Sequence, residues 1–523
     1  MQHKLFKSRI IGGKILFSKV GTAAICGIQS EIVMVEVDTS DGLPGFSMVG
    51  YLTSEVKEAQ DRVRTAIKNS GYRLQPKRVT ISLTPASIRK SGSGFDLPIA
   101  VAVLVAFGYV PAAMTEKMFF AGELSLDGSV RGIQGILGMV MEAKKAGFTA
   151  CMIPRENVEE GAMIQGIEVY GISHLREVVE HLTSDKKLTK TAINIEEKLS
   201  EAIYSSEIDF ADIRGQHMVK RAAEIAAAGM HNLLISGPPG AGKTMIARRI
   251  PGILPPLSLE EALEISQIHS VAGILPEKGI VSERPFRMPH HTISAIALTG
   301  GGRVPHPGEI SLAHRGVLYL DELPEFQNET LEILRQPLEE GEVRISRSSG
   351  QYTFPADFML VASRNPCKCG YFPDRSRCSC SEGEVRRYLH RISRPLLDRI
   401  DLHVEARQVR YEELKNQTSL EETTEEIRTR VLRAHEMQKQ RYSGSRYRFN
   451  SQLSSSALEQ YCPLGQEEEE QMRQVYTKKK MTARAYHRMI KVARTIADLE
   501  GSEKIKMEHL SEAVFYRPSE FLM

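Results

Sequence analysis

Hydrophobic and polar positions divide the chain into regions with different periodicities. Apolar residues alternate with polar ones over 32–37 and 78–83, which predicts half-buried strands, and recur at helical spacing over 55–69 and 133–145, which predicts amphipathic helices. The apolar run 97–110 is shorter than the roughly 18 residues of a membrane span and predicts a buried helix. These patterns predict an α+β domain with its own core.

A different pattern follows a polar stretch. Residues 183–206 are rich in charge, which predicts a linker with one short helix. Short Val, Ile and Leu runs between helical segments then predict a parallel α/β sheet, and the last region is charged and helical. The expected boundaries are an N-terminal extension at 1–11, the α+β domain at 12–182, the linker at 183–206, the α/β domain at 207–407 and the helical domain at 408–523.

Composition limits the function classes. The 523 residues are 41% hydrophobic and 25% charged, which is typical of a globular protein and excludes a mostly disordered chain. A formal net charge of +3 excludes a general polycation, so nucleic-acid binding would need local patches, and the absence of Trp disfavours a base-stacking platform. With no apolar signal segment and only seven Cys, we expect a reducing, cytoplasmic location and no membrane partner.

A glycine-rich loop joins a predicted strand, 232–236, to a predicted helix. This is the phosphate-binding pattern G-x-x-x-x-G-K-T in its strand–loop–helix context, where backbone N–H groups and the helix N-terminus surround a phosphate. Lys243 is expected to reach the β- and γ-phosphates of a nucleotide, and the Thr244 hydroxyl to ligate Mg²⁺. The residues of the predicted loop are Gly237, Pro238, Pro239, Gly240, Ala241, Gly242, Lys243 and Thr244.

Two acids complete the candidate hydrolytic site. The buried strand 317–320 ends in Asp321, which can bind the nucleotide's Mg²⁺ through water, and in Glu322, which can polarise the attacking water. The alternative is an ordinary strand that ends in acids.

Three further polar residues are candidates. Asn365 follows the strand 358–363 and can orient the attacking water. Arg399 can act as a finger that reaches the γ-phosphate of a neighbouring subunit, although a lone Arg is usually a salt-bridge partner. Arg484, at the start of a predicted helix, can sense the nucleotide.

These motifs together resemble an AAA+ ATPase, and the family resembled is the ComM/YifB family of magnesium-chelatase-like proteins. The resemblance runs from about residue 14 to 516. It implies a hexameric ring that uses ATP and Mg²⁺; ComM members act as DNA helicases in branch migration during natural transformation, which also implies recombination proteins as partners. The segments that carry it are GLPGFSMVG (42–50), RVRTAIKNSGY (62–72), FDLPIA (95–100), ADIRGQHMVKRAAEIAAAGMHNLLISGPPGAGKT (211–244), PHHTISAIALTGGG (289–302), PGEISLAHRGVLYLDELPEF (307–326) and RPLLDRIDLHV (394–404).

Two positions depart from the family pattern. Arg364 precedes Asn365, where the family usually has a small or apolar residue, and Arg394 stands where it usually has Gly before Pro. Both are expected near the interface between subunits.

The first domain is similar to the protease domain of Lon and the terminal domain of RadA, over 122–130 and 144–148. In a gapless alignment, Leu137 takes the position of the protease's catalytic Lys, and Ser93 lies in the former serine loop. A Ser needs a base to become a nucleophile, and Leu137 cannot be one. The resemblance therefore implies a Lon-like fold without proteolysis.

Two insertions separate the motifs. Residues 274–308 resemble the helix-2 insert of this clade, which implies a loop that points into the pore of the ring. His290 and His291 on this loop are candidates for DNA contact, with packing as the equal alternative.

The second insertion, 342–354, alternates around a Ser-Ser-Gly turn and predicts a β-hairpin that carries Arg344 and Arg347. In a hexamer these arginines would form a basic ring, whose phosphate contacts are independent of base sequence and sensitive to salt. The alternative is ordinary surface or subunit contacts.

Four cysteines lie within fourteen residues. Four thiolates in a reducing compartment suit tetrahedral Zn²⁺ with a structural role, and the alternative is four reduced thiols in a packed loop. The candidate ligands are Cys367, Cys369, Cys378 and Cys380.

Two functions remain open from the sequence. The first is an ATP-driven DNA translocase or helicase of the ComM type, and the second is a chelatase-like ATPase that remodels a protein partner. The near-neutral charge leaves the second open. The intact ATPase residues disfavour a pure scaffold.

Overall fold

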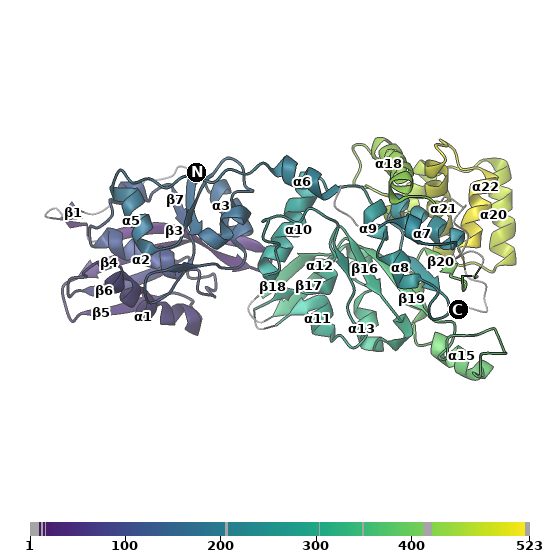
Figure 1. The fold of residues 1–523 in the computed structure, drawn as a ribbon, viewed down its shortest axis with the longest axis horizontal. Helices are drawn as coiled ribbons and strands as arrows, with labels where there is room; N and C mark the ends of the chain where they lie inside the picture. The colour runs from purple at the N-terminus through teal and green to yellow at the C-terminus, as the bar shows by residue number, and fades with distance from the viewer. Residues whose placement is uncertain are drawn as a thin grey trace.

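The computed structural model describes the chain over 10–11, 14–15, 17–203, 208–302, 304–347, 350–409, 411 and 421–517. Along the longest axis of the molecule, an N-terminal α/β domain is followed by a central parallel sheet with its helices, and then by C-terminal helices (Figure 1). The mixed α/β fold predicted from the sequence is confirmed. None of the helices in the described ranges is long and apolar enough to cross a membrane.

A seven-stranded mixed sheet forms the N-terminal domain. Its strand order is β11 (Glu168–Ile172), β10 (Ala150–Pro154), β7 (Met118–Phe120), β3 (Phe17–Cys26), β4 (Gln29–Ser40), β6 (Arg78–Thr84) and β5 (Gly45–Val49). Its helices are α1 (Ser54–Asn69), α2 (Asp96–Ala106), α3 (Ile136–Lys145), α4 (Val158–Gly161) and α5 (Leu175–Thr183). The short strands are β1 (Ile10–Ile11), β2 (Lys14–Ile15), β8 (Glu123–Leu124) and β9 (Val130–Arg131).

Two predicted helices show how residues set their limits. Every residue of α2 is buried, as a helix that is apolar on all sides requires. The helix ends before Gly108, whose φ of +82° is a left-handed conformation that favours glycine. α3 begins at Ile136, later than predicted, because Gly135 has a φ of +77°.

Five parallel strands form the central sheet. Their order is β13 (Phe286–Arg287), β16 (Val317–Leu320), β19 (Met359–Arg364), β12 (Leu233–Ser236) and β20 (Leu402–Glu405). Leu233 lies opposite Val361 on one side and Leu402 on the other, so the C-terminal ends of these strands share one edge. The helices are α7 (His217–Gly229), α8 (Lys243–Ala247), α9 (Ile250–Ile253), α10 (Leu259–Ala272), α11 (Ala295–Thr299), α12 (Glu309–Leu312), α13 (Asn328–Ile333), α14 (Pro337–Glu340), α15 (Glu382–Leu389) and α16 (Arg394–Leu397).

The insertion 274–308 is only partly a loop, which corrects the expectation drawn from the resemblance. Its residues Phe286 and Arg287 form the edge strand β13, and the Phe286 ring stacks on Tyr319 of β16 with ring centroids 5.9 Å apart. Aromatic packing against the sheet is the physical reason that this part joins the core. The rest carries α11 and an antiparallel pair, β14 (Gly300–Gly301) with β15 (His306–Pro307).

The predicted hairpin is confirmed. β17 (Glu342–Arg347) and β18 (Gly350–Pro355) pair antiparallel along their length. The hairpin reaches the N-terminal domain, because a Cβ on Gly27, in the turn between β3 and β4, would lie 3.1 Å from Tyr352 Cδ1 (Figure 1).

The described C-terminal helices pack against the central domain. α18 and α21 both contact α7, and one hydrophobic cluster joins these helices to the central sheet. The helices are α18 (Thr424–Arg441), α19 (Ser455–Tyr461), α20 (Gln466–Lys478), α21 (Ala483–Leu499) and α22 (Met507–Phe515).

Another hydrophobic cluster joins the N-terminal domain to α10. It contains Leu137 of α3 and Ile265 of α10, both fully buried. At its margin the buried carboxylate of Glu160 accepts hydrogen bonds from the Leu137 N–H, over 2.8 Å, and from the Ser270 hydroxyl. Because an unpaired buried carboxylate is costly, these bonds tie the domain to α10. The helix predicted in the linker is α6 (Ile195–Ile203), whose first residue lies in the same cluster.

Candidate nucleotide-binding and active site

The loop of residues 237–242 lies at the C-terminal edge of the central sheet, between β12 and α8. Gly240 and Gly242 have φ values of +76° and +81°, which glycine adopts without strain. A Cβ on Gly237 would lie 2.4 Å from the Ala406 carbonyl oxygen, so only glycine lets the chain pass the end of β20. These backbone requirements suit a loop whose N–H groups surround a phosphate.

Lys243 is the first residue of α8 and is 8% exposed. Its ammonium donates to the carbonyl oxygens of Gly237 (2.7 Å) and Pro238 (3.0 Å) and to Asn365 Oδ1 (3.0 Å). Burial lowers the pKa of Lys243, and the carboxylates at the end of β16 oppose that effect. The lysine therefore links the phosphate-binding loop to the end of β19.

Thr244 and Asp321 are in direct contact. Thr244 Oγ1 donates to Asp321 Oδ2 over 3.0 Å, and the Tyr319 hydroxyl donates to Asp321 Oδ1 over 3.0 Å. The Ser363 hydroxyl also donates to Asp321 Oδ1. A hydroxyl and a carboxylate at this spacing offer the hard oxygen ligands that Mg²⁺ prefers, so these residues fit a Mg²⁺ site beside the loop.

Glu322 follows Asp321 at the same edge, and its side chain is exposed. Its φ of +52° is a left-handed conformation that residues other than glycine seldom adopt. Its N–H donates to Asp321 Oδ1 (3.1 Å) and to Ser363 Oγ (3.2 Å). These bonds hold a strained turn that directs Asp321 towards Thr244 and leaves the Glu322 carboxylate at the exposed surface of the site.

Arg364, the last residue of β19, lies under the phosphate-binding loop. Its Nε donates to Ser236 Oγ over 2.9 Å, and its carbonyl oxygen accepts from the Gly237 N–H over 3.1 Å. Burial lowers the pKa of Arg364 to about 10. Its side chain is 3% exposed and packs inside the chain, while its predicted proximity to a subunit interface stays a prediction. Arg394 is exposed.

Arg399 does not join the residues around Lys243. It precedes β20, whose first residue Leu402 pairs with Leu233 at the start of β12, so Arg399 lies at the N-terminal edge of the sheet. Its guanidinium pairs with Glu339 of α14. A four-residue strand is about 13 Å long, and this length separates Arg399 from the phosphate-binding loop of its own chain.

Arg484 lies in the exposed first turn of α21, on the same side as Arg399. One turn later, Arg488 Nε lies 3.4 Å from Asp401 Oδ1. Burial lowers the pKa of Arg488, and the neighbouring charges of Arg399 and Arg484 lower it further. Burial alone would raise the pKa of Asp401, but the hydrogen bond and charge of His231, with Arg488, hold it well below its usual range. Arg399 and Arg484 therefore both lie on the side of the N-terminal edge of the central sheet.

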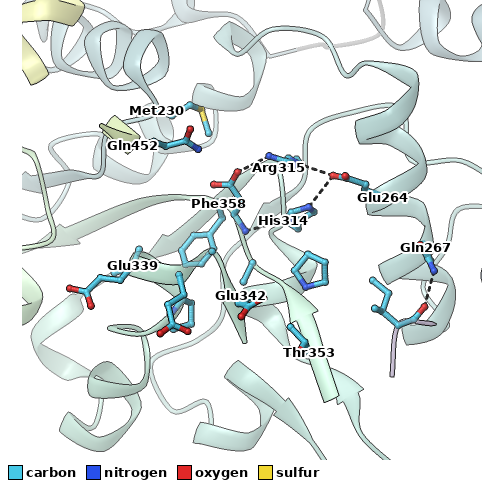
Figure 2. Close-up of a pocket in the computed structure, with 18 of the residues that line it drawn as sticks. Met230, Glu264, Gln267, His314, Arg315, Glu339, Glu342, Thr353, Phe358 and Gln452 are labelled. Carbon is cyan, nitrogen blue, oxygen red and sulfur yellow. Dashed lines mark hydrogen bonds and ion pairs between the residues drawn. The ribbon is translucent and has the colours of Figure 1, made fainter. Parts of the chain in front are cut away.

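Arg399 also lines a cavity of about 1240 Å³ between the N-terminal domain and the N-terminal edge of the central sheet. Figure 2 shows Glu339 and Glu342 on one part of its wall, and His314 and Arg315 on another. His314 Nε2 and Arg315 Nε both bind Glu264 Oε2 of α10, over 3.3 Å and 3.1 Å respectively. The hydrogen bond from His314 lowers the pKa of Glu264 to about 2, against the effect of burial.

The hairpin arginines differ in their surroundings. Arg344 Nε donates to Glu342 over 2.6 Å, and its guanidinium lies 3.6 Å from Glu340. Arg347 is exposed at the end of β17, beside Gly301, where an added Cβ would lie 3.2 Å from its guanidinium. Acidic neighbours on the same chain therefore neutralise Arg344 locally.

The candidate histidines lie near the C-terminal edge of the central sheet, where the phosphate-binding loop also lies. The rings of His290 and His291 have centroids 4.1 Å apart, and the His291 ring meets Phe326 edge-on at 6.4 Å. Phe326 follows the turn Leu323–Glu325 after Glu322, so the pair is near the candidate hydrolytic residues.

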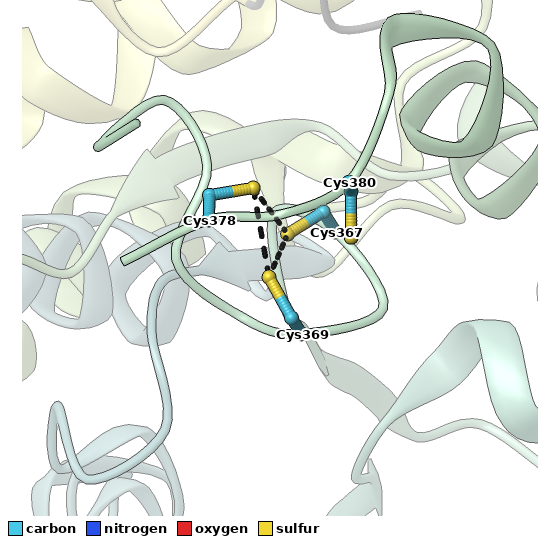
Figure 3. A group of neighbouring side chains, drawn as sticks. All are labelled: Cys367, Cys369, Cys378 and Cys380. Carbon is cyan, nitrogen blue, oxygen red and sulfur yellow. Dashed lines mark hydrogen bonds between the residues drawn. The ribbon is translucent and has the colours of Figure 1, made fainter. Parts of the chain in front are cut away.

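The four cysteines converge (Figure 3). The Sγ atoms of Cys367 and Cys369 are 3.3 Å apart, and Cys378 Sγ lies 3.7 and 3.5 Å from them. The Sγ atom of Cys380 completes the group, and the four sulfur atoms all lie within 4.8 Å of one another. Tetrahedral zinc with bonds of about 2.3 Å requires sulfur atoms about 3.8 Å apart, so the donor set fits a Zn²⁺ ion.

Sequence reasoning missed two hydroxyl groups of this site. Tyr319 and Ser363 both donate to Asp321. Each lies two residues before a predicted site residue on a strand, Tyr319 before Asp321 and Ser363 before Asn365. Because side chains two apart on a strand share a face, this spacing was the available signal.

Comparisons with known proteins identify the family. Three family models match: magnesium chelatase subunit ChlI over 209–414, subunit ChlI of Mg-chelatase over 35–157, and the subunit ChlI C-terminal model over 421–517. The chain is 40% identical to competence protein ComM of Haemophilus influenzae over 95% of this chain and 97% of that protein. It is 41% identical to YifB of Salmonella typhimurium over 96% of this chain and 97% of that protein. It is 29% identical to the magnesium-chelatase 38 kDa subunit of Cereibacter sphaeroides over 38% of this chain and 59% of that protein. The chain therefore belongs to the ComM/YifB family of magnesium-chelatase-like AAA+ proteins.

Proposed function

We propose that the protein hydrolyses ATP at the loop between β12 and α8. Lys243 is positioned to neutralise the β- and γ-phosphates, and Glu322 to polarise the attacking water, which Asn365 orients. Mg²⁺, held by Thr244 and through water by Asp321, would supply the remaining charge neutralisation. The hydrogen bonds that join Lys243 to Asn365 and Thr244 to Asp321 support this assignment.

One observation supports assembly into a ring: Arg399 and Lys243 lie at opposite edges of the central sheet. An arginine finger at the opposite edge can serve only the nucleotide of a neighbouring subunit. Arg484 lies at that edge as well, so both would complete a site whose loop belongs to the next chain. Repeated head to tail and closed by rotation, this contact gives a ring, and we take the ring to be the hexamer of the AAA+ family.

The proposed substrate is DNA, and the proposed activity is that of a helicase or translocase that drives branch migration in recombination during natural transformation. A relative that covers nearly the whole chain is named a competence protein, which supports this proposal. Arg347 at the tip of the hairpin, with Arg344 behind it, is a basic feature that a ring would repeat around its centre. We assign His290 and His291 to the edge of the sheet that carries the phosphate-binding loop, in preference to contact with DNA.

A second candidate is a chelatase-like ATPase that remodels a protein partner. Arg344 favours it, because two glutamates of its own chain already neutralise this guanidinium. The net charge of +3 also excludes a generally basic protein, so DNA binding would need local patches.

We also propose that the four cysteines bind a structural Zn²⁺. Their convergence supports this, and four thiolates leave no open coordination position for catalysis.

One experiment separates the two functions. ATP turnover is measured with no DNA, with single-stranded DNA and with branched DNA, across a range of salt concentrations, on protein whose assembly is checked by mass. A motor that acts on DNA shows stimulation that falls with salt. An assembled ring that hydrolyses ATP but binds neither DNA at low salt contradicts the DNA proposal and supports the remodeller.

A further inference from the structure

The segment that carries the four cysteines touches the phosphate-binding loop. A Cβ on Gly370 would lie 2.5 Å from Cδ and 2.8 Å from Cγ of Pro239. The ring of Pro239 is covalently closed onto its own backbone, so it cannot rotate away as the end of a flexible side chain can. Gly370 has a φ of +88°, which glycine adopts without strain. The two segments are therefore closely packed at this point.

A second connection lies at the start of the segment. Asn365, two residues before Cys367, accepts a hydrogen bond from Lys243 over 3.0 Å. Arg364, just before it, accepts from the Gly237 N–H over 3.1 Å. The cysteine segment is therefore attached to the phosphate-binding loop at two places, with Cys367 between them.

Cys367 is hydrogen-bonded to the residues on both sides of Tyr371. The Gly370 N–H donates to the Cys367 carbonyl oxygen over 3.0 Å, and the Phe372 N–H donates to Cys367 Sγ over 3.4 Å. Residues 365–381 form neither a helix nor a strand, and α15 begins only at Glu382. The surrounding hydrophobic cluster is small. A metal on four thiolates would supply folding free energy that so small a cluster cannot.

We propose that metal binding by the four cysteines and nucleotide binding at the adjacent loop are thermodynamically linked. The metal-bound segment holds Pro239 and Asn365 where the loop accepts a nucleotide, and a bound nucleotide in turn retains the metal. Such coupling is reciprocal by necessity. The cysteines and Gly370 act as positioning residues, because they act through Pro239 and Asn365. The linkage rests on the proposed function, since it requires both the ATP site and the Zn²⁺ site.

The first test removes the metal from the intact protein. The dissociation constant of a fluorescent ATP analogue with Mg²⁺ is measured before and after extraction of Zn²⁺ by phenanthroline, which leaves Mg²⁺ in solution, and again after Zn²⁺ is restored. Circular dichroism shows whether the stripped protein is folded. We expect binding to weaken about tenfold and to recover on reloading. In the reverse direction, the analogue should slow the release of Zn²⁺ to the chelator.

The second test leaves every thiol in place. Gly370→Ala forces a methyl group against Pro239, so it should weaken nucleotide binding while the Zn²⁺ content stays unchanged. Gly444→Ala is the matched control for backbone strain, because Gly444 also has a positive φ, of +76°, and a Cβ there meets no atom within 4 Å. Adding Pro239→Ala removes the ring that the methyl group meets, so Gly370→Ala should weaken binding less in the Pro239→Ala background than in the wild type.

The outcomes are distinguishable. A folded, stripped protein with an unchanged dissociation constant overturns the linkage, as does a Gly370→Ala protein that binds the analogue normally. A wild-type protein that binds no ATP, or takes up no Zn²⁺, contradicts the proposed function and overturns the linkage with it.

Discussion

Arg399 pairs with Glu339 of its own chain, at the edge of the central sheet opposite Lys243. The pairing orients the guanidinium towards the cavity at that edge and away from its own phosphate-binding loop. An arginine that serves a neighbouring subunit must exchange Glu339 for the γ-phosphate when the subunits meet. In the proposed ring, the pair with Glu339 would be the resting contact of Arg399.

Mixed rings test this role. Arg399→Ala subunits and Lys243→Ala subunits should each be inactive alone, and an equal mixture should recover about a quarter of wild-type turnover, because random mixing in a closed ring leaves that share of interfaces intact. Steady-state ATP hydrolysis after subunit exchange measures it. Arg399→Ala rings that assemble and hydrolyse ATP normally would move the finger to Arg391 or Arg394.

Glu322→Gln should bind ATP with wild-type affinity and hydrolyse it about 10²–10⁴-fold more slowly, because loss of a general base removes that much of the rate. Glu325→Gln is the matched control, since Glu325 lies one turn later and pairs with Arg391 over 3.1 Å. Single-turnover hydrolysis and nucleotide binding are measured on both variants. Near-normal turnover in the Glu322 variant would sink the assignment.

Purified protein should contain one Zn²⁺ per chain. Cys378→Ser should lose the metal and unfold at lower temperature, whereas Cys26→Ser, outside the cluster, should keep it. Elemental analysis of protein prepared without chelator measures the content. Four freely titrating thiols in folded, metal-free protein would return the cluster to ordinary packing.

Arg347→Ala should weaken DNA binding equally for all base sequences and flatten the log–log salt dependence by about one unit, because a lost phosphate contact releases one counterion fewer. Arg344→Ala should have a smaller effect, since Glu342 already engages that guanidinium. Arg473→Ala, on the exposed face of α20, is the surface control. Anisotropy titrations at several salt concentrations decide it. Equal salt slopes in all three variants would remove the hairpin from the DNA site.

His435 predicts a loss of stability in mild acid. Burial against α7 lowers its pKa from the ordinary 6.5 to about 4, so the unfolded chain takes up a proton first as the pH falls. Stability from this group is complete above pH 6.5 and falls by about 3 kcal/mol by pH 4. His435→Gln keeps a donor for the Ala227 carbonyl oxygen but cannot ionise, so its unfolding free energy should fall less. Urea denaturation at pH 7 and pH 4.5 compares the two proteins, and parallel losses would contradict the prediction.

Sequence predicted that the candidate nucleotide-binding residues would meet at the C-terminal edge of the central sheet, because their placement depends on local patterns. Lys243, Thr244, Asp321 and Asn365 each follow a strand, and the C-terminal ends of parallel strands meet at one edge. The contacts that the sequence did not predict join positions far apart along the chain. The approach of Gly370 to Pro239 is one example, and it depends on the path of an irregular segment whose shape no periodicity reports.

The fold shows the same division. Helix and strand periodicities predicted α1, β4, β6 and the hairpin, whereas the strand β13 inside the insertion was missed. Two residues are too few for a periodic signal, and the position of Phe286 follows from its packing on Tyr319. The buried position of Arg364 was also missed. A charged residue at the end of a strand gave no sign that its side chain would bind Ser236 inside the chain.

The cluster that α3 and α10 share has a consequence for how the protein can be taken apart. Cutting the chain in the charged stretch before residue 208 would expose Ile265 and leave Ser270 without the carboxylate of Glu160, so the truncated motor would be prone to aggregation. In the proposed hexamer, six N-terminal domains held in this way would form a collar fixed to the ATPase domains through α10 instead of through a flexible tether.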